Sequence, residues 1–280
     1  MTAAVLLVLS SGFLHAVWNL FTKKSVNKSA FLWCCQLVAI VVFLPWAISD
    51  LGKAQSVPPA YLLLAASMLL HGTYMVLLAK AYTLGDLSQV YPVMRGMGPL
   101  LVPIIAVLFL NERLAAAGWA GVLLIVSGIA ALSRHGSNAA ASKRAVAAAL
   151  AVGICIAFYI LVDKLSLQYM PATVLNEATN IANLLALSYP AAASGALRSE
   201  WKANWRTVLL GGVAAPGGYL LFLFALTLGQ AAMLTPIREI GTVFGTLMGI
   251  YILNEPQGGK RIASSILIAA GVVLLAFTPN

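Results

Sequence analysis

The chain has 280 residues, of which 61% are hydrophobic and only 9% are charged, and its formal net charge is +9. No soluble domain could bury that much apolar surface, so the composition excludes a water-soluble protein. The Lys and Arg residues lie in short loops between apolar runs, a pattern that reports membrane topology and not a nucleic-acid-binding surface. We therefore predict an integral, multi-pass membrane protein whose surroundings are the lipid bilayer, with no nucleic-acid partner.

Ten segments of the chain are long and apolar enough to be membrane-spanning helices, which need about 20 residues each. Polar or Pro/Gly-rich breaks separate them. The first is expected to be a membrane helix and not a signal peptide, because no basic region precedes it. In chain order, the predicted spans are 2–22, 29–49, 60–83, 87–110, 115–133, 145–165, 172–195, 206–228, 230–253 and 261–278.

Two segments of the chain repeat one pattern. Residues 81–112 and residues 225–255 both carry Thr-Leu-Gly, a polar step, a proline that opens an apolar run, and a final Leu-Asn-Glu. The two prolines, Pro92 and Pro236, therefore correspond to each other. Because five spans lie in each half, an odd number, the second half must insert into the membrane in the opposite orientation.

This repetition predicts an all-α membrane protein of ten transmembrane helices in two inverted five-helix repeats. The repeats are expected at 1–134 and 145–280, with a linker at 135–144. In such a fold the binding site lies between the repeats, near the middle of the membrane. Most Lys and Arg residues follow the odd-numbered spans, so the positive-inside rule places both chain termini outside the cytoplasm.

The paired Leu-Asn-Glu ends and the Trp18-x4-Lys23 pattern of the first span resemble the drug/metabolite transporter superfamily, EamA type. The resemblance covers nearly the whole chain as two EamA-like units. It implies a ten-helix transporter with both termini in the cytoplasm, opposite to the orientation favoured by the charges, and both orientations stay open. The run from His15 to Asn19 is also similar to EamA-like membrane proteins associated with phosphonate utilisation.

Three ionisable residues are expected at membrane depth in the fourth and ninth spans. Arg95 and Glu239 have the same separation in sequence as the two corresponding prolines, and Arg238 precedes Glu239. Ionisable residues at this depth usually face a cavity or a partner. One interpretation is a buried ion pair that locks the two repeats together. The other is substrate binding, with arginine for a carboxylate or phosphonate and Glu239 for an amine or a proton.

Other candidate binding residues are polar or aromatic. His15, Trp18 and Asn19 share one face of the first span, and His15 titrates in the range used for proton coupling. Their alternative role is structural hydrogen bonding and packing. Aromatic walls bind organic cations through their ring faces, although aromatic residues also serve ordinary packing. The aromatic candidates on the other spans are Tyr74, Tyr91, Tyr159 and Tyr219.

The seventh span carries a polar stripe. Asn176, Asn180 and Asn183 share one face, with Glu177 at its margin. Glu177 is a candidate proton or cation site; the alternative is a cap at the start of the helix, near the lipid headgroups. In the ninth span, Gly241 begins a run of glycines at every fourth position, which we expect to let the fourth or eighth span approach closely.

These observations favour a secondary active transporter of a small polar, zwitterionic metabolite, an amino acid or an aminophosphonate, by alternating access with proton coupling or exchange. Alternatives are an exporter of organic cations, drugs or quaternary amines, and a flippase for lipid-linked substrates. An intramembrane enzyme is not expected, because no HExxH zinc site or Gly-x-Ser-x-Gly nucleophile motif occurs. We expect no cofactor and no metal, a small-molecule substrate, a monomer or homodimer, and a bacterial cytoplasmic membrane.

Overall fold

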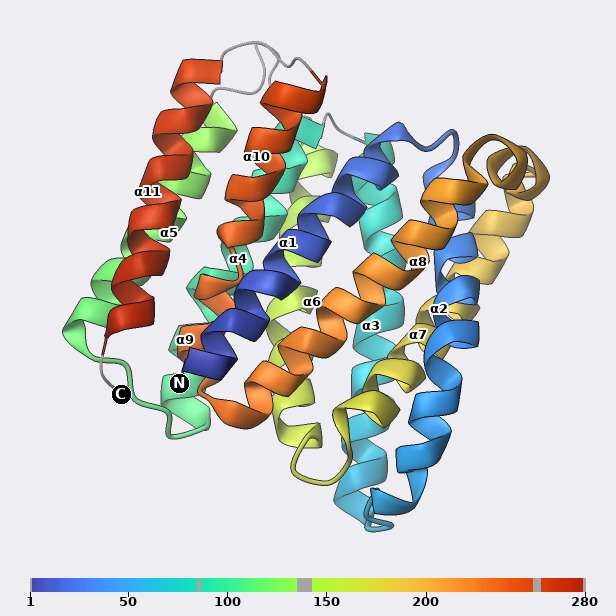
Figure 1. The fold of residues 1–280 in the computed structure, drawn as a ribbon, viewed down its shortest axis with the longest axis horizontal. Coiled ribbons are helices and arrows are strands. Elements are labelled where there is room, and N and C mark those ends of the chain that lie inside the picture. The colour runs from blue at the N-terminus through green and yellow to red at the C-terminus, as the bar shows by residue number, and fades with distance from the viewer. Residues whose placement is uncertain (1, 85–86, 135–142, 254–257, 279–280) are drawn as a thin grey trace.

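The computed structural model describes the chain except residues 1, 85–86, 135–142, 254–257 and 279–280, and within the described residues all regular structure is helical (Figure 1). A short 3-10 helix, η1, spans Leu51–Lys53. The α-helices are α1 Thr2–Lys24, α2 Lys28–Asp50, α3 Pro58–Leu84, α4 Leu87–Phe109, α5 Ala116–Arg134, α6 Lys143–Ser166, α7 Ala172–Ala193, α8 Leu197–Leu228, α9 Ala231–Ile237, α10 Ile240–Leu253 and α11 Gly258–Phe277.

The predicted all-α fold is confirmed, and two spans differ in detail. The ninth span is broken into α9 and α10 by a turn at Arg238 and Glu239, two residues after Pro236. After the break the chain tightens, since the backbone N–H groups of Glu239 and Thr242 bond three residues back, at 3.0 and 2.8 Å. The helix α8 starts earlier than predicted, at Leu197, and non-helical dihedrals at Asn204 divide it close to the predicted start.

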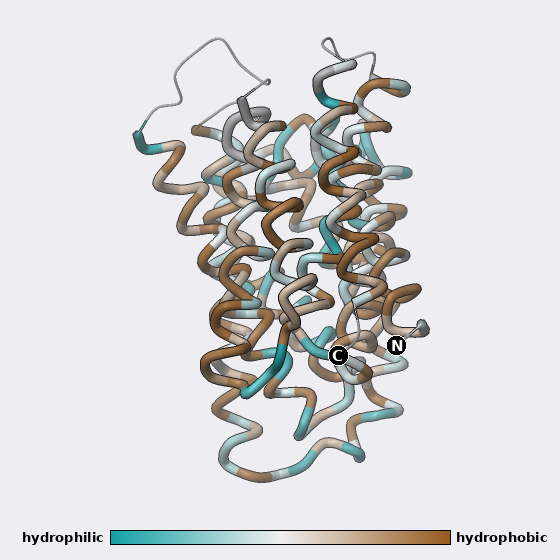
Figure 2. The backbone as a smooth tube through the Cα atoms, turned by 90° about the vertical axis from the view of Figure 1, so that its left-hand side faces the viewer, coloured by the Kyte–Doolittle hydropathy of each residue, from teal (hydrophilic) through white to brown (hydrophobic). Residues whose placement is uncertain are grey.

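The outside of the bundle is apolar, as an integral membrane protein requires. Five helices, α1, α2, α3, α6 and α8, are long and apolar enough to cross a membrane, and α4, α5 and α11 contain shorter apolar helical stretches. Large apolar side chains stand outside, with Leu62 72% and Phe109 75% exposed. Figure 2 shows hydrophobic residues along most of the height of the bundle. Surfaces of this kind are stable in lipid and not in water.

The helix contacts repeat under a pseudo-twofold exchange of the two halves. Contact of α1 with α8 is matched by α6 with α3, contact of α2 with α8 by α7 with α3, and contact of α1 with α10 by α6 with α4. The pairs α2–α7, α5–α11 and α4–α9 join each helix to its own counterpart. In Figure 1, α1 begins at the end of the bundle where α6 finishes, so the repeats are inverted.

The contact between α5 and α11 shows the symmetry at the level of single residues. A Cβ atom on Gly121 would lie 2.9 Å from the carbonyl oxygen of Gly271, and one on Gly128 would lie 2.9 Å from that of Ser264. Gly121 and Ser264 have the same separation in sequence as Gly128 and Gly271. The two close approaches are therefore one contact repeated by the pseudo-twofold axis, and small residues allow both.

The expected partner of the glycines in the ninth span was wrong. A Cβ atom on Gly241 would lie 2.7 Å from the carbonyl oxygen of Gly12, so the helix that approaches closely is α1 and not the fourth or eighth span. One turn further along α10, a Cβ atom on Gly245 would meet no other atom within 4 Å. The approach is local, next to the break between α9 and α10.

The first Leu-Asn-Glu end is a capping device. Asn111 takes a left-handed conformation with φ of 54°, which asparagine tolerates, and ends α4. The Glu112 carboxylate then accepts the backbone N–H groups of Ala231 and Ala232 at 3.0 and 2.7 Å, capping the start of α9. Glu255, at the second such end, lies outside the described residues.

Replacing Glu112 with alanine should lower the free energy of unfolding by about 0.5–2 kcal/mol, because two N–H groups at the start of α9 lose their acceptor. Thermal melting of the purified protein in detergent measures this loss. Glu112→Gln keeps one acceptor oxygen and should lose less. Equal melting of the alanine variant and the parent protein would show that the cap does not stabilise α9.

Candidate functional site

The break in the ninth span places two charged residues inside the protein. Arg238 is the C-cap residue of α9, and Glu239 lies between α9 and α10. Their side chains are buried, with residue exposures of 6% and 4%. The helix α4 packs against α9 and brings in Arg95, which is 8% exposed. An unwound segment of this kind frees backbone and side-chain polar groups at membrane depth, which are tolerated only where they are buried in protein or line a cavity.

Arg95 and Glu239 form an ion pair across the two repeats. Arg95 Nη2 lies 3.1 Å from Glu239 Oε1, and the Thr242 hydroxyl donates to Glu239 Oε2 at 3.1 Å. Arg95 Nη1 also lies 3.1 Å from Nε2 of His15. Because a guanidinium can only donate, His15 Nε2 accepts this bond, and its proton resides on Nδ1. His15 is therefore a neutral partner of Arg95 in this arrangement.

Arg238 contacts a hydroxyl and two aromatic faces. Its Nε donates to the Ser11 hydroxyl of α1 at 3.1 Å. Its guanidinium carbon lies 4.5 Å from the ring centre of Phe222 and 5.2 Å from that of Tyr219, both on α8. Among the described residues, Arg95 and not Arg238 is the arginine within ion-pair distance of Glu239. The region of these three side chains thus carries an excess positive charge that aromatic faces stabilise.

The other predicted residues fall in three places. Trp18 is buried beside His15, with ring centres 5.4 Å apart, and Asn19 is half-buried one position further along α1. Tyr159 lies between Tyr74 and Tyr219, with ring centres 5.5 and 5.8 Å away. Tyr91 was also predicted to bind the substrate, and its side chain is outside the described part of the structure.

Glu177 lies apart from the arginines and is not a helix cap. It is the sixth residue of α7 and is buried, so the interpretation as a cap near the headgroups was wrong. Its Oε2 accepts a bond of 3.2 Å from the Asn180 side chain on the same helix. Within the described part of the chain, the other carboxylate oxygen of Glu177 and both amide atoms of Asn176 have no protein partner. The polar stripe therefore faces inward with hydrogen-bonding capacity to spare.

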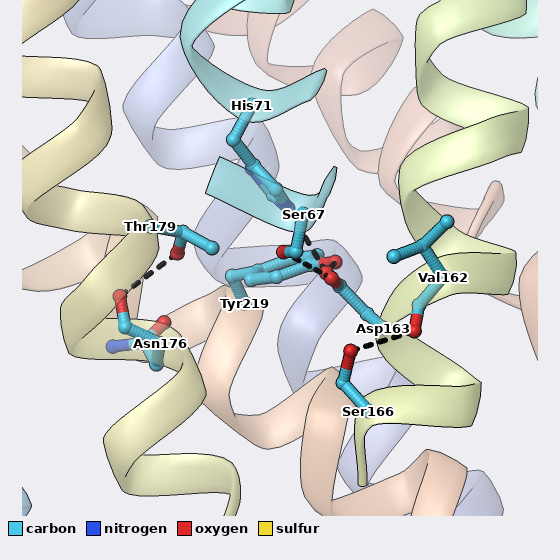
Figure 3. Close-up of polar contacts among 8 residues, drawn as sticks. All are labelled: Ser67, His71, Val162, Asp163, Ser166, Asn176, Thr179 and Tyr219. Atoms are coloured by element: carbon cyan, nitrogen blue, oxygen red, sulfur yellow. Dashed lines mark hydrogen bonds and ion pairs between the residues drawn. The ribbon is translucent and has the colours of Figure 1, made fainter. Parts of the chain in front are cut away.

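A second polar cluster centres on Asp163, which sequence analysis did not select as a binding residue (Figure 3). Asp163 is fully buried on α6 and accepts bonds from Ser67 at 2.5 Å, from His71 Nε2 at 2.9 Å and from the Tyr219 hydroxyl. The sequence feature that could have indicated this cluster is an aspartate inside an apolar span. The partners of Asp163 lie on two helices that are distant from it in the sequence. Tyr219 joins both clusters, since its ring faces Arg238 while its hydroxyl faces Asp163.

Comparison with known proteins identifies the family. The sequence pattern of the EamA-like transporter family matches residues 2–134 and again residues 143–277. The chain belongs to the EamA-like transporter family. It is therefore a membrane transporter and an integral multi-pass membrane protein, with the two-repeat fold of the drug/metabolite transporter superfamily. Proteins of this family are transporters and not enzymes.

Two further similarities concern part of the sequence and the fold. An uncharacterized transporter in the cobO 3' region of Sinorhizobium sp is 33% identical over 73 residues, which are 26% of this chain and 52% of that protein. The match with this relative thus spans about half of the relative's length. A solved protein crystal structure shares the fold, with a TM-score of 0.77 at 18% identity, over 98% of this EamA-like transporter and 96% of the other chain.

Proposed function

We propose that this EamA-like transporter is a secondary active carrier of a small zwitterionic metabolite, an amino acid or an aminophosphonate. The observation that carries the proposal is the buried group of Arg95, Arg238 and Glu239 at the contact of the two repeats. Arg95 and Arg238 would hold the anionic group of the substrate. Glu239 would meet its amine.

A zwitterion matches the charges that separate when the ion pair opens. Breaking a buried pair leaves two uncompensated charges, which is strongly unfavourable. A ligand that offers an anion to Arg95 and a cation to Glu239 replaces both partners at once, so the repeats can move apart without exposing a bare charge. Arg238 adds a second donor for the anion, as a carboxylate or phosphonate requires. Opening and closing at this contact would then be the alternating-access step.

Export of organic cations is less well supported. A cation exporter needs free aromatic faces and an excess of carboxylates. Here the guanidinium of Arg238 itself lies over the faces of Tyr219 and Phe222. Glu239 is already paired with Arg95. An organic cation would have to displace one arginine and approach the other, which the like charge opposes.

The setting proposed for this transport is the bacterial cytoplasmic membrane, which the similarity to a Sinorhizobium transporter supports. The protein would work as a monomer or a homodimer, and no cofactor or nucleic acid is part of the proposal. Its driving force would be a proton or the exchange of one solute for another. His15, Glu177 and Glu239 are the coupling residues that the sequence suggests.

A ligand panel on purified protein tests the substrate class. We expect glycine or 2-aminoethylphosphonate to raise the apparent melting temperature, whereas choline and a sugar phosphate do not. A ligand that binds only the folded protein stabilises it by about 2.7 kcal/mol at 100 times its Kd. A shift produced only by choline would overturn the zwitterion proposal and favour a quaternary-amine transporter.

A further inference from the structure

The cluster around Asp163 has a composition suited to binding a proton. His71 and Ser67 come from α3, Asp163 from α6 and Tyr219 from α8 (Figure 3). Histidine is the side chain whose ordinary charge change falls between pH 5 and 8. Asp163 lies within hydrogen-bond distance of all three other side chains, so as a carboxylate it can be the counter-ion of an imidazolium. The group of this cluster that can gain a positive charge is therefore His71.

The hydrogen bonds fix which nitrogen of His71 can gain the proton. Nε2 lies 2.9 Å from Asp163 Oδ2 and donates to it, because the carboxylate can only accept. A further proton would add at Nδ1, forming an imidazolium whose charge Asp163 balances. With neutral His71, the cluster keeps one negative charge buried among neutral donors, which is costly at membrane depth. Protonation of His71 would pair this charge with an opposite one 2.9 Å away.

The surroundings of His71 favour it over His15 for this role. Tyr159 of α6 stacks on the His71 ring with centres 4.1 Å apart, and Tyr219 of α8 lies edge-on at 5.2 Å. In contrast, His15 already accepts a bond from the cationic Arg95. Among the described residues, the other buried charged side chains on the neighbouring helices are Arg95 on α4, Glu177 on α7 and Glu200 on α8, with Arg238 and Glu239 at the break. Those that are only half-buried are Lys28 and Asp50 on α2 and Lys164 on α6, and Lys80 on α3 is exposed.

Tyr219 provides a physical connection between the cluster and the arginines. Its hydroxyl donates to Asp163, and its ring lies 5.2 Å from the Arg238 guanidinium. If Arg238 turns toward an anion, the ring loses its cation and Tyr219 can shift relative to Asp163. Any such change in the hydrogen bonds of Asp163 alters how well His71 holds its proton, and by linkage the proton alters ligand affinity equally.

We propose that His71, positioned by Asp163, is a further proton-binding group of this transporter, beside the coupling residues named above, and that Tyr219 connects its protonation to a ligand held at Arg238. The ligand end of this connection rests on the proposed function. The proton end depends only on the cluster and can be tested without a substrate.

Nitrogen-15 labelling of histidine rings tests the proton end. The chain has only three histidines, so solid-state NMR of the protein in lipid bilayers can resolve each ring, with His71→Gln assigning one. We expect the His71 ring to change from neutral to imidazolium as the pH is lowered and to lose this change in Asp163→Asn. A His71 ring whose charge stays constant at every pH at which the protein is folded would overturn the proposal.

A matched control separates the specific effect of Asp163 on the His71 titration from the general effect of losing a buried carboxylate. Glu200 is also fully buried and accepts bonds from the Asn27 backbone and the Asn204 side chain, at 2.7 and 2.6 Å. It precedes Tyr219 by about 28 Å along α8. Glu200→Gln should leave the His71 titration unchanged. If Asp163→Asn does not fold, Ser67→Ala is the second variant: it removes one donor to Asp163 and keeps the His71 ring, whose titration midpoint should move.

The connection is tested by Tyr219→Phe, which removes one donor to Asp163 and keeps the ring against Arg238. The midpoint of the His71 titration should move in this variant; an unchanged midpoint would overturn the role of Tyr219. In melting experiments, the shift caused by glycine or 2-aminoethylphosphonate should depend on pH in the parent protein and not in His71→Gln. If neither probe shifts melting at any pH, the zwitterion proposal fails, while the NMR titration still decides the proton site.

Discussion

Arg95→Ala should strongly reduce the stabilisation by zwitterionic ligands and also destabilise the empty protein by about 3–5 kcal/mol. The reason for the second effect is Glu239, whose carboxylate would stay buried without the guanidinium that lies 3.1 Å away. The first effect follows from the loss of one anion-binding donor, which weakens binding roughly ten- to hundredfold. Both quantities come from melting curves with and without glycine or 2-aminoethylphosphonate.

A double mutant separates stability from binding. Arg95→Ala combined with Glu239→Ala removes both charges, so most of the lost stability should return, because no bare charge is left buried. Ligand binding should not return, since both proposed contacts with the zwitterion are gone. If Arg95→Ala alone binds ligand as the parent protein does, Arg95 is a structural residue and the substrate site lies elsewhere.

The overall architecture was predictable because the two halves of the chain carry the same sequence pattern of apolar runs and breaks. Each span is recognisable as a run of about 20 apolar residues. Because each half has an odd number of spans, the second half must cross the membrane in the opposite orientation to the first. The pairing of Arg95 with Glu239 was predictable for the same reason, since residues at equal sequence positions in two inverted repeats meet near the pseudo-twofold axis. The separation in sequence therefore carried spatial information that single residue types do not.

The second cluster was not predictable in this way. Asp163 and His71 are 92 residues apart, and no repeat relates them to each other. Whether an aspartate in an apolar helix meets donors depends on the rotation of α6 against α3, which packing of the whole bundle decides. The sequence also shows the Pro236 that weakens the ninth span, but it does not show that the chain resumes as α10 directly after Glu239. The helix propensities of the residues indicate where a helix can break, but tertiary contacts decide which of these positions is the actual break.

Gly241→Ala should destabilise the protein by about 1–3 kcal/mol and weaken ligand binding, because the added methyl group has no room. Its Cβ atom would lie 2.7 Å from the oxygen and 3.2 Å from two carbons of the Gly12 backbone. Backbone atoms cannot turn aside as a flexible side chain can, so α1 and α10 must separate. Melting curves and the ligand-induced shift measure the two effects.

Gly245→Ala is the matched control, since it lies one turn away on α10 and its Cβ atom would meet nothing within 4 Å. It should melt at or slightly above the temperature of the parent protein, because alanine suits a helix better than glycine. If both alanine variants behave alike, the approach of α1 to α10 is not tight in the folded protein. A loss of stability confined to Gly241→Ala would also concern the candidate binding site around Arg238. The neighbour of Gly12 is Ser11, the hydroxyl that holds Arg238, and moving α1 outward moves that hydroxyl away from the guanidinium.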